Sequence, residues 1–128
     1  MVPSPDSPPP LNQLEVKVID ALGRLGITGQ RAELPFENAA IWADFGTGSQ
    51  LFVNATRTST GRGEFRVVDE RQLEGIRVQR VEYASGPPQR QRFECSTDTY
   101  EVSGAIPPGF PNMDQFVSRF IRALGCGA

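Results

Sequence analysis

The sequence has no histidine, one lysine (Lys17) and two cysteines, Cys95 and Cys126. Without an imidazole, the chain lacks the usual general base for a serine or cysteine nucleophile and the commonest metal ligand. Two cysteines alone also fit no zinc-binding pattern. We therefore assign no catalytic residue, no metal site and no cofactor, and the interpretation leans away from an enzyme.

A long hydrophobic run and an excess of positive charge are also missing. Because no segment of about 18 apolar residues occurs, no part of this sequence is predicted to span a membrane. The net charge of −2 provides no positive field, so nucleic-acid binding is not expected. The 128 residues, 38% hydrophobic and 22% charged, are typical of one globular domain.

The first ten residues differ in composition from the rest. Residues 1–10 contain five prolines and only Met1 and Val2 as apolar side chains. This composition predicts an extended or disordered spacer, followed by a single domain over residues 11–128. We expect the sequence to begin after a removed signal or membrane anchor.

The two cysteines are predicted to form a disulfide. Cys126 is the third residue from the end of the chain, which normally frays unless it is held, and Cys95 lies in an expected strand. The bond would close a loop of about 32 residues, worth roughly 3.5–4 kcal/mol. Two unrelated buried thiols are the alternative. A disulfide indicates an extracytoplasmic location: secreted, periplasmic or cell-surface.

A period of 3.6 residues predicts two helices. The first spans residues 13–25, with Asn12 and Glu15 as a capping box, and the second follows Asn112 and ends at Gly125. The two apolar stripes are Leu14, Val18, Ala21, Leu22 and Leu25, and then Phe116, Val117, Phe120, Ile121 and Leu124. Both stripes are expected to face the core rather than a partner.

Between the helices, alternating apolar and polar residues predict strands. The expected strand segments are 39–45, 51–56, 65–68, 75–83 and a tight hairpin over 91–102. We expect residues 27–38 to be irregular, residues 58–63 to form an exposed hairpin loop, and a bulge near Gln79. The predicted fold is α+β: an antiparallel sheet of about five to six strands, with the N-terminal and C-terminal helices packed on one face.

Two groups of side chains are candidates for a ligand surface. The first group is Arg77, Arg80, Arg90 and Arg92, which come from neighbouring expected strands and would form a cationic strip for an anionic ligand or a cell-wall polymer. The nearby Glu74, Glu82 and Glu94 favour a cross-strand ion-pair lattice instead. The second group is Trp42, Phe52 and Tyr83, which would either line a groove on the second sheet face or cover the core beneath a helix.

The layout over residues 11–126 resembles that of small bacterial envelope and lipoprotein domains, some of which share a PsbP-like α/β arrangement. The segments that carry the resemblance are Ile41-Trp42-Ala43-Asp44-Phe45, Gln50-Leu51-Phe52-Val53, Arg92-Phe93-Glu94-Cys95, Tyr100-Glu101-Val102 and the closing helix 116–126. The resemblance implies an extracytoplasmic, non-enzymatic role. It brings no catalytic residues to this sequence.

Three functional hypotheses follow. The first is a non-catalytic ligand- or protein-binding or sensing domain of a secreted or membrane-anchored bacterial protein. Its partner would be a protein or an envelope ligand, and it would meet the membrane only through an anchor outside this sequence. The second is a small envelope hydrolase that acts on glycans through a pair of carboxylates. The third is a cytoplasmic partner-binding domain with free thiols.

Overall fold

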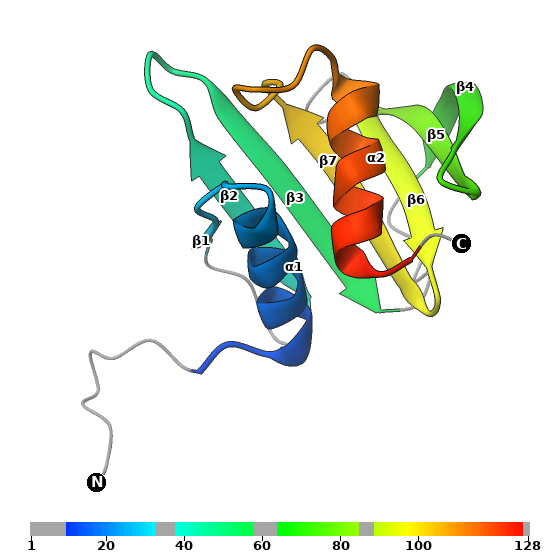
Figure 1. Cartoon of the computed structure of the whole chain (residues 1–128). Coiled ribbons are helices and arrows are strands. Elements are labelled where there is room, and N and C mark those ends of the chain that lie inside the picture. The colour runs from blue at the N-terminus through cyan, green and yellow to red at the C-terminus, as the bar shows by residue number, and fades with distance from the viewer. Residues whose placement is uncertain (1–9, 33–37, 58–63, 85–88, 127–128) are drawn as a thin grey trace, which may run out of the picture.

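Two helices and one seven-stranded sheet make up the part of the chain that the computed structural model describes, residues 10–32, 38–57, 64–84 and 89–126 (Figure 1). The elements are α1 (Gln13–Arg24), β1 (Gln30–Arg31), β2 (Ala39–Asp44), β3 (Gln50–Arg57), β4 (Phe65–Leu73), β5 (Ile76–Tyr83), β6 (Arg90–Cys95), β7 (Asp98–Gly104) and α2 (Met113–Leu124). All strand pairs are antiparallel, in the order β1-β2-β3-β7-β6-β5-β4. The α+β class is confirmed.

The expected number of strands was too low, and one expected hairpin is wrong. β1 lies within residues 27–38, which were expected to be irregular. It was not predicted because a strand of two residues is too short to show alternation. β3 and β4 are not neighbours: β3 pairs with β7, and β4 pairs with β5 at the far edge. Three strands, β7, β6 and β5, therefore lie between β3 and β4 in the sheet. The loop expected over 58–63, like residues 1–9 of the predicted spacer, lies outside the described residues.

The bulge lies on β4 rather than near Gln79 on β5. Val67 pairs with Val81, whereas Asp69 pairs with Arg80, so Val68 is the extra residue. β5 keeps an unbroken register with β6. The apolar residues of β5 do not all lie on one face. Ile76 and Val78 face the helices, whereas Val81 and Tyr83 face the opposite side of the sheet.

Both helices are capped as their sequences predict. The Asn12 side chain accepts a hydrogen bond from the Glu15 amide, and the Glu15 carboxylate accepts one from the Asn12 amide, each at 2.8 Å. At the other end of the chain, Gly125 adopts a left-handed conformation with φ of 78°. The Cys126 amide then bonds the Ile121 carbonyl at 3.1 Å, which turns the chain back after α2.

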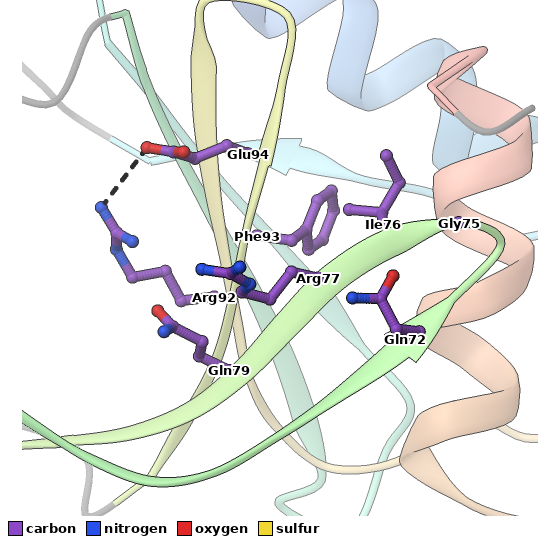
Figure 2. A pocket seen from close by; sticks show the side chains of 8 residues that line it. All are labelled: Gln72, Gly75, Ile76, Arg77, Gln79, Arg92, Phe93 and Glu94. Carbon is purple, nitrogen blue, oxygen red and sulfur yellow. Dashed lines mark ion pairs between the residues drawn. The ribbon is translucent and has the colours of Figure 1, made fainter.

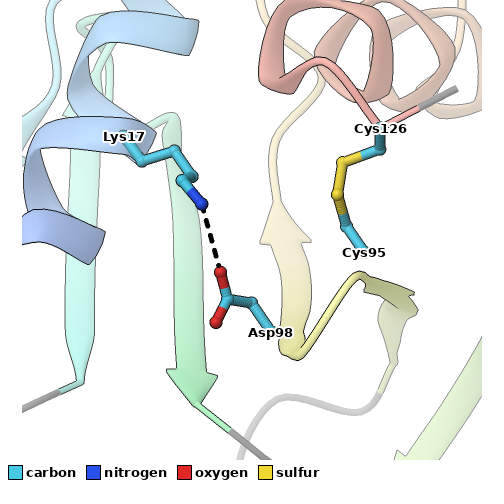
Figure 3. The surroundings of a disulfide bond; sticks show 4 residues. All are labelled: Lys17, Cys95, Asp98 and Cys126. Atoms are coloured by element: carbon cyan, nitrogen blue, oxygen red, sulfur yellow. Dashed lines mark hydrogen bonds and ion pairs between the residues drawn. A yellow bond between two sulfur atoms is a disulfide. The ribbon is translucent and has the colours of Figure 1, made fainter.

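This turn delivers Cys126 to Cys95 at the end of β6, and the two form a disulfide with their Cα atoms 5.5 Å apart (Figure 3). Close by, the single lysine of the chain links α1 to β7, because Lys17 Nζ lies 3.3 Å from a carboxylate oxygen of Asp98. Both helices are thus tied to the same end of the sheet.

The core lies between the sheet and the two helices, which cover one sheet face (Figure 1). The α2 stripe faces inward as predicted: Phe116, Val117, Phe120 and Ile121 are fully buried. Phe120 meets Phe93 and Tyr100 edge-on, with ring centroids 6.3 and 6.2 Å apart. Within the described residues, no helix is both long enough and apolar enough to cross a membrane.

A candidate binding face on the sheet

The sheet has a second face, which neither α1 nor α2 covers. Side chains alternate along each strand, so the neighbours of core residues such as Ile41 and Val53 point to the opposite side. Trp42, which follows Ile41 on β2, is paired with Phe52, which precedes Val53 on β3. The interpretation that they cover the core beneath a helix is therefore wrong, since both described helices lie on the other side.

Aromatic and apolar side chains remain exposed on this face. Phe52 is 40% exposed on β3, and Phe65 and Val67 are 37% and 42% exposed on β4. Between these two groups lies β7, the central strand, whose outward residues Thr99, Glu101 and Ser103 are all buried.

The centre of the face holds a buried carboxylate, that of Glu101. Its side chain is only 7% exposed, and it accepts hydrogen bonds from the guanidinium of Arg90 at 3.2 Å and from the hydroxyl of Tyr83. The Arg90 guanidinium also lies over the Tyr83 ring, 4.6 Å from its centroid. The Glu101 carboxylate can be buried here because a positive charge and two hydrogen-bond donors replace its contacts with water.

Burial raises the pKa of Tyr83 to about 12, and the hydrogen bond to the negative Glu101 adds to the effect. Both causes favour the neutral phenol, since a phenolate would face a carboxylate in a poorly hydrated place. Tyr83 therefore acts as a hydrogen-bond donor throughout the physiological pH range.

A second arginine stacks beside this group. The rings of Phe65 and Tyr83 are 5.5 Å apart, and the Arg92 guanidinium lies 5.0 Å from the centroid of Phe65. Two guanidinium groups thus rest on two neighbouring rings, an arrangement that holds long side chains flat against the sheet. We call Phe65, Tyr83, Arg90, Arg92 and Glu101 the arginine–aromatic cluster.

Arg77 lies on the same face but at its margin, beside a hollow of about 420 Å³ (Figure 2). The hollow opens where β5 separates from β6, because the pairing of these strands stops at Val78 and Phe93. Arg77 is 67% exposed, 3.9 Å from Glu70. The residues lining the hollow are Gln72, Gly75, Ile76, Arg77, Gln79, Arg92, Phe93 and Glu94.

Arg80 does not join the other three arginines of the predicted cationic strip. It is paired in the sheet with Asp69 and Gln91 and projects to the helix side, where it forms an ion pair with Asp69. The strip therefore comprises Arg77, Arg90 and Arg92, of which only Arg77 is largely exposed.

The ion-pair lattice predicted with Glu74, Glu82 and Glu94 forms only in part. Glu94 lies 4.0 Å from Arg92, whereas Glu82 binds Arg66 at 2.7 Å. Glu74 instead reaches α2, where hydrogen bonds from Ser118 and then Arg122 lower the pKa of its carboxyl group. Sequence spacing alone did not reveal these partners, because they depend on which strands and helices are neighbours.

A second hollow, of about 640 Å³, lies between the start of α2 and the outer strands. It contains two carboxylates, Asp69 and Asp114, on either side of Arg71, whose nitrogens lie 3.7 Å from Asp69 and 2.5 Å from Asp114. A glycosidase needs two carboxyl groups that flank the scissile bond of its substrate. Here both carboxylates contact the same guanidinium, so each is engaged in an ion pair within the chain.

The sequence analysis proposed the four arginines and the three aromatic residues as two separate groups, and the structure brings all of them except Arg80 to one face. Glu101 and Phe65 were not among its candidates. Glu101 lies between two apolar strand neighbours, an ordinary position for an exposed polar residue, and only the strand order shows that it is central and buried. A scan with protein-family models gives no match to this chain, and searches of the curated proteins and of the solved structures give none either.

Proposed function

We propose that this chain is a non-catalytic binding or sensing domain, which acts outside the cytoplasm and engages a protein partner through the sheet face opposite its helices. The observation that carries the proposal is the arginine–aromatic cluster. In it, Arg90 and Tyr83 bind the buried carboxylate of Glu101, and Phe65 and Arg92 pack beside them, on a face that no described helix covers.

The residue types on this face support a protein as the partner. Tryptophan, tyrosine and arginine are the residues that most often dominate the binding energy of protein interfaces. Here Trp42 lies on one side of β7, and Tyr83 and Arg90 lie on the other. Because Arg90 and Tyr83 are already held by Glu101, little side-chain freedom would be lost when a partner covers them.

The disulfide supports the proposed location. Bonds of this kind persist in oxidising surroundings and are rare in the cytosol, where thiols are kept reduced. The Cys95–Cys126 bond also joins the end of β6 to the turn that follows α2. We therefore place the domain in the cell envelope or beyond it, in agreement with the layout that resembles small envelope domains.

The proposal can be tested with a photo-crosslinking amino acid placed at single positions in the native cells. Phe52 on the sheet face and Val16 on the outer side of α1 form a matched pair, because each is 40% exposed. We expect a discrete crosslinked protein band from position 52 and none from position 16. Equal crosslinking from both positions, or crosslinking from position 16 alone, would contradict the proposed face.

A band that is sensitive to glycan-degrading treatment would identify an envelope polymer instead of a protein. Free thiols on both cysteines in freshly isolated native protein would separately contradict the proposed location, and would favour the cytoplasmic hypothesis.

A further inference from the structure

The far edge of the sheet carries an unusual density of exposed apolar side chains. The described residues include seven large hydrophobic side chains that are exposed: Leu11, Val16, Phe52, Phe65, Val67, Val68 and Ile106. Three of them, Phe65, Val67 and Val68, fall within four consecutive residues of β4. The first six residues of this strand are all exposed.

β4 is also a long edge strand. It has nine residues and is paired along one side with β5, and no other described strand pairs with it (Figure 1). The opposite edge of the sheet is formed by the two-residue strand β1, which offers little backbone to a partner. An edge strand presents unpaired backbone donors and acceptors, and a long apolar one is a template for another strand.

We propose that β4 pairs antiparallel with β4 of a second copy of this chain, which joins two sheets into one across a two-fold axis. The choice of a second copy rests on the charges along the strand. Glu64, just before the strand, and Arg66, Asp69 and Arg71 within it alternate in sign, whereas the remaining charged residue of β4, Glu70, pairs with Gln79 and points to the other face. When a strand is reversed against its own copy about Val67 and Val68, each of the four alternating charges meets one of the opposite sign.

The bulge is what places these four side chains on one face. Arg66 pairs with Glu82 and Asp69 pairs with Arg80, and these two partners are two residues apart on the regular strand β5. Arg66 and Asp69 therefore project to the same side although they are three residues apart, because Val68 is the extra residue. Without the bulge they would point to opposite faces.

The reversed register sets Arg66 opposite Asp69 and Glu64 opposite Arg71, and the symmetry repeats both pairs. Opposite charges directly across antiparallel strands are stabilising, and like charges are destabilising. Arg66 is 73% exposed and Asp69 is 43% exposed despite their bonds within the chain, so both can take a second partner. The exposed Phe65 and Val67 would lie on the opposite face of the joint, next to those of the second copy.

The interface would be small, because a single pair of strands contributes most of it. We therefore expect a reversible dimer that dissociates on dilution in the micromolar range rather than a permanent one. This inference is independent of the proposed function, since the sheet face binds its partner in a monomer or in a dimer.

The test is sedimentation equilibrium of the whole chain over a wide range of concentrations. The Arg66→Asp variant creates two pairs of like charges in each dimer, one at each symmetric contact, and it should raise the dimer dissociation constant by roughly tenfold or more. The double variant Arg66→Asp with Asp69→Arg restores opposite charges across the interface and should recover the dimer. Arg77→Asp, a similar reversal at an exposed residue of β5, is the matched control and should leave the dimer unchanged.

Thermal melts of each variant establish that it is folded before its association is judged. A wild-type chain that stays monomeric at the highest concentration overturns the inference. A dimer that is equally strong in Arg66→Asp also overturns it, because the interface must then lie elsewhere. A chain that stays monomeric and instead binds an unrelated extended peptide along β4 would overturn the inference as well.

Discussion

The hydroxyl of Tyr83 on β5 donates a hydrogen bond to the carboxylate of Glu101 on β7, across the intervening strand β6. Arg90 on β6 completes the connection, because it contacts both residues. Three adjacent strands are thus joined by side chains on the face that the helices leave open. The backbone ladder alone would not require any of these residue types.

The first prediction concerns the pH dependence of the two tyrosines. The pKa of Tyr83 is raised from 10.0 to about 12, and burial together with the nearby Asp98 raises that of Tyr100 as well. A pKa that is higher in the folded than in the unfolded chain stabilises the fold below the unfolded value, and this stabilisation is lost as the pH rises. We expect stability to fall progressively above pH 10.

Ultraviolet absorbance of tyrosinate checks this prediction directly, since the chain has only these two tyrosines. In the folded protein, no tyrosine should ionise near pH 10. In protein unfolded with guanidinium chloride, both should do so, because the ordinary pKa of tyrosine is about 10. Ionisation of one tyrosine near pH 10 in the folded state would show that the Tyr83–Glu101 bond is absent or open.

The second prediction separates the two arginines of the arginine–aromatic cluster. Arg90→Met leaves the buried Glu101 carboxylate without its charged partner, which should lower the free energy of unfolding by about 3 kcal/mol or more. Arg92→Met is the matched control, because Arg92 lies on the same strand and face with similar exposure, 18% against 15%. Its nearest carboxylate, Glu94, is exposed and 4.0 Å away, so the loss should be about 1 kcal/mol or less.

Urea unfolding of both variants provides the comparison. Replacing Arg90 and Glu101 together by apolar residues should recover a large part of the loss, since no unpaired charge then remains. If the two arginine variants lose equal stability, the loss comes from the packing of arginine on the rings and not from the buried ion pair.

The third prediction is that the disulfide is present and stabilising. Alkylation of the unreduced, denatured protein should add no mass, and alkylation after reduction should add two groups. With a sequence separation of 31 between the two cysteines, the chain-entropy relation gives roughly 3.7 kcal/mol for the bond. The Cys95→Ala, Cys126→Ala double variant should have the same thermal midpoint as the reduced protein. If this variant were as stable as the oxidised protein, packing alone would hold α2 in place.

The sequence predicted local features of the fold well. The capping residues Asn12 and Asn112, the glycine that ends α2 and its apolar stripe each act within a few residues of the chain, and all are present. Alternation likewise predicted where most of the strands lie, although β4, expected over residues 65–68, extends to Leu73. These features depend on short-range geometry, which the sequence contains directly.

The order of the strands in the sheet could not be predicted from these short-range patterns. Neighbouring strands in sequence usually pair, so a hairpin between β3 and β4 was the natural expectation. Instead, β7, β6 and β5 lie between β3 and β4, an order that makes β7 the central strand and β4 an edge strand. The same strand order makes Glu101, on β7, central and buried. Arg80 is separated from Arg77 by alternation along β5, and Phe65 reaches Tyr83 because β4 pairs with β5.

The last prediction compares one aromatic residue from each face of the sheet. Phe120 is fully buried, stacks on Phe116 with ring centroids 5.7 Å apart, and meets two further rings edge-on. Phe120→Ala would leave a cavity that a rigid helix and sheet cannot close, and should cost roughly 3–5 kcal/mol. Because a domain's whole stability is typically about 5–15 kcal/mol, this variant should melt at a much lower temperature than the parent.

Phe52→Ala removes the same number of atoms from a side chain that is 40% exposed on the open face. It should change stability by less than about 1 kcal/mol, since much of the ring already contacts water. Thermal melts of Phe120→Ala and Phe52→Ala under identical conditions compare the two losses of stability. A large loss in Phe52→Ala would mean that the second face packs against some other part of the chain, and the proposed binding face would have to be abandoned.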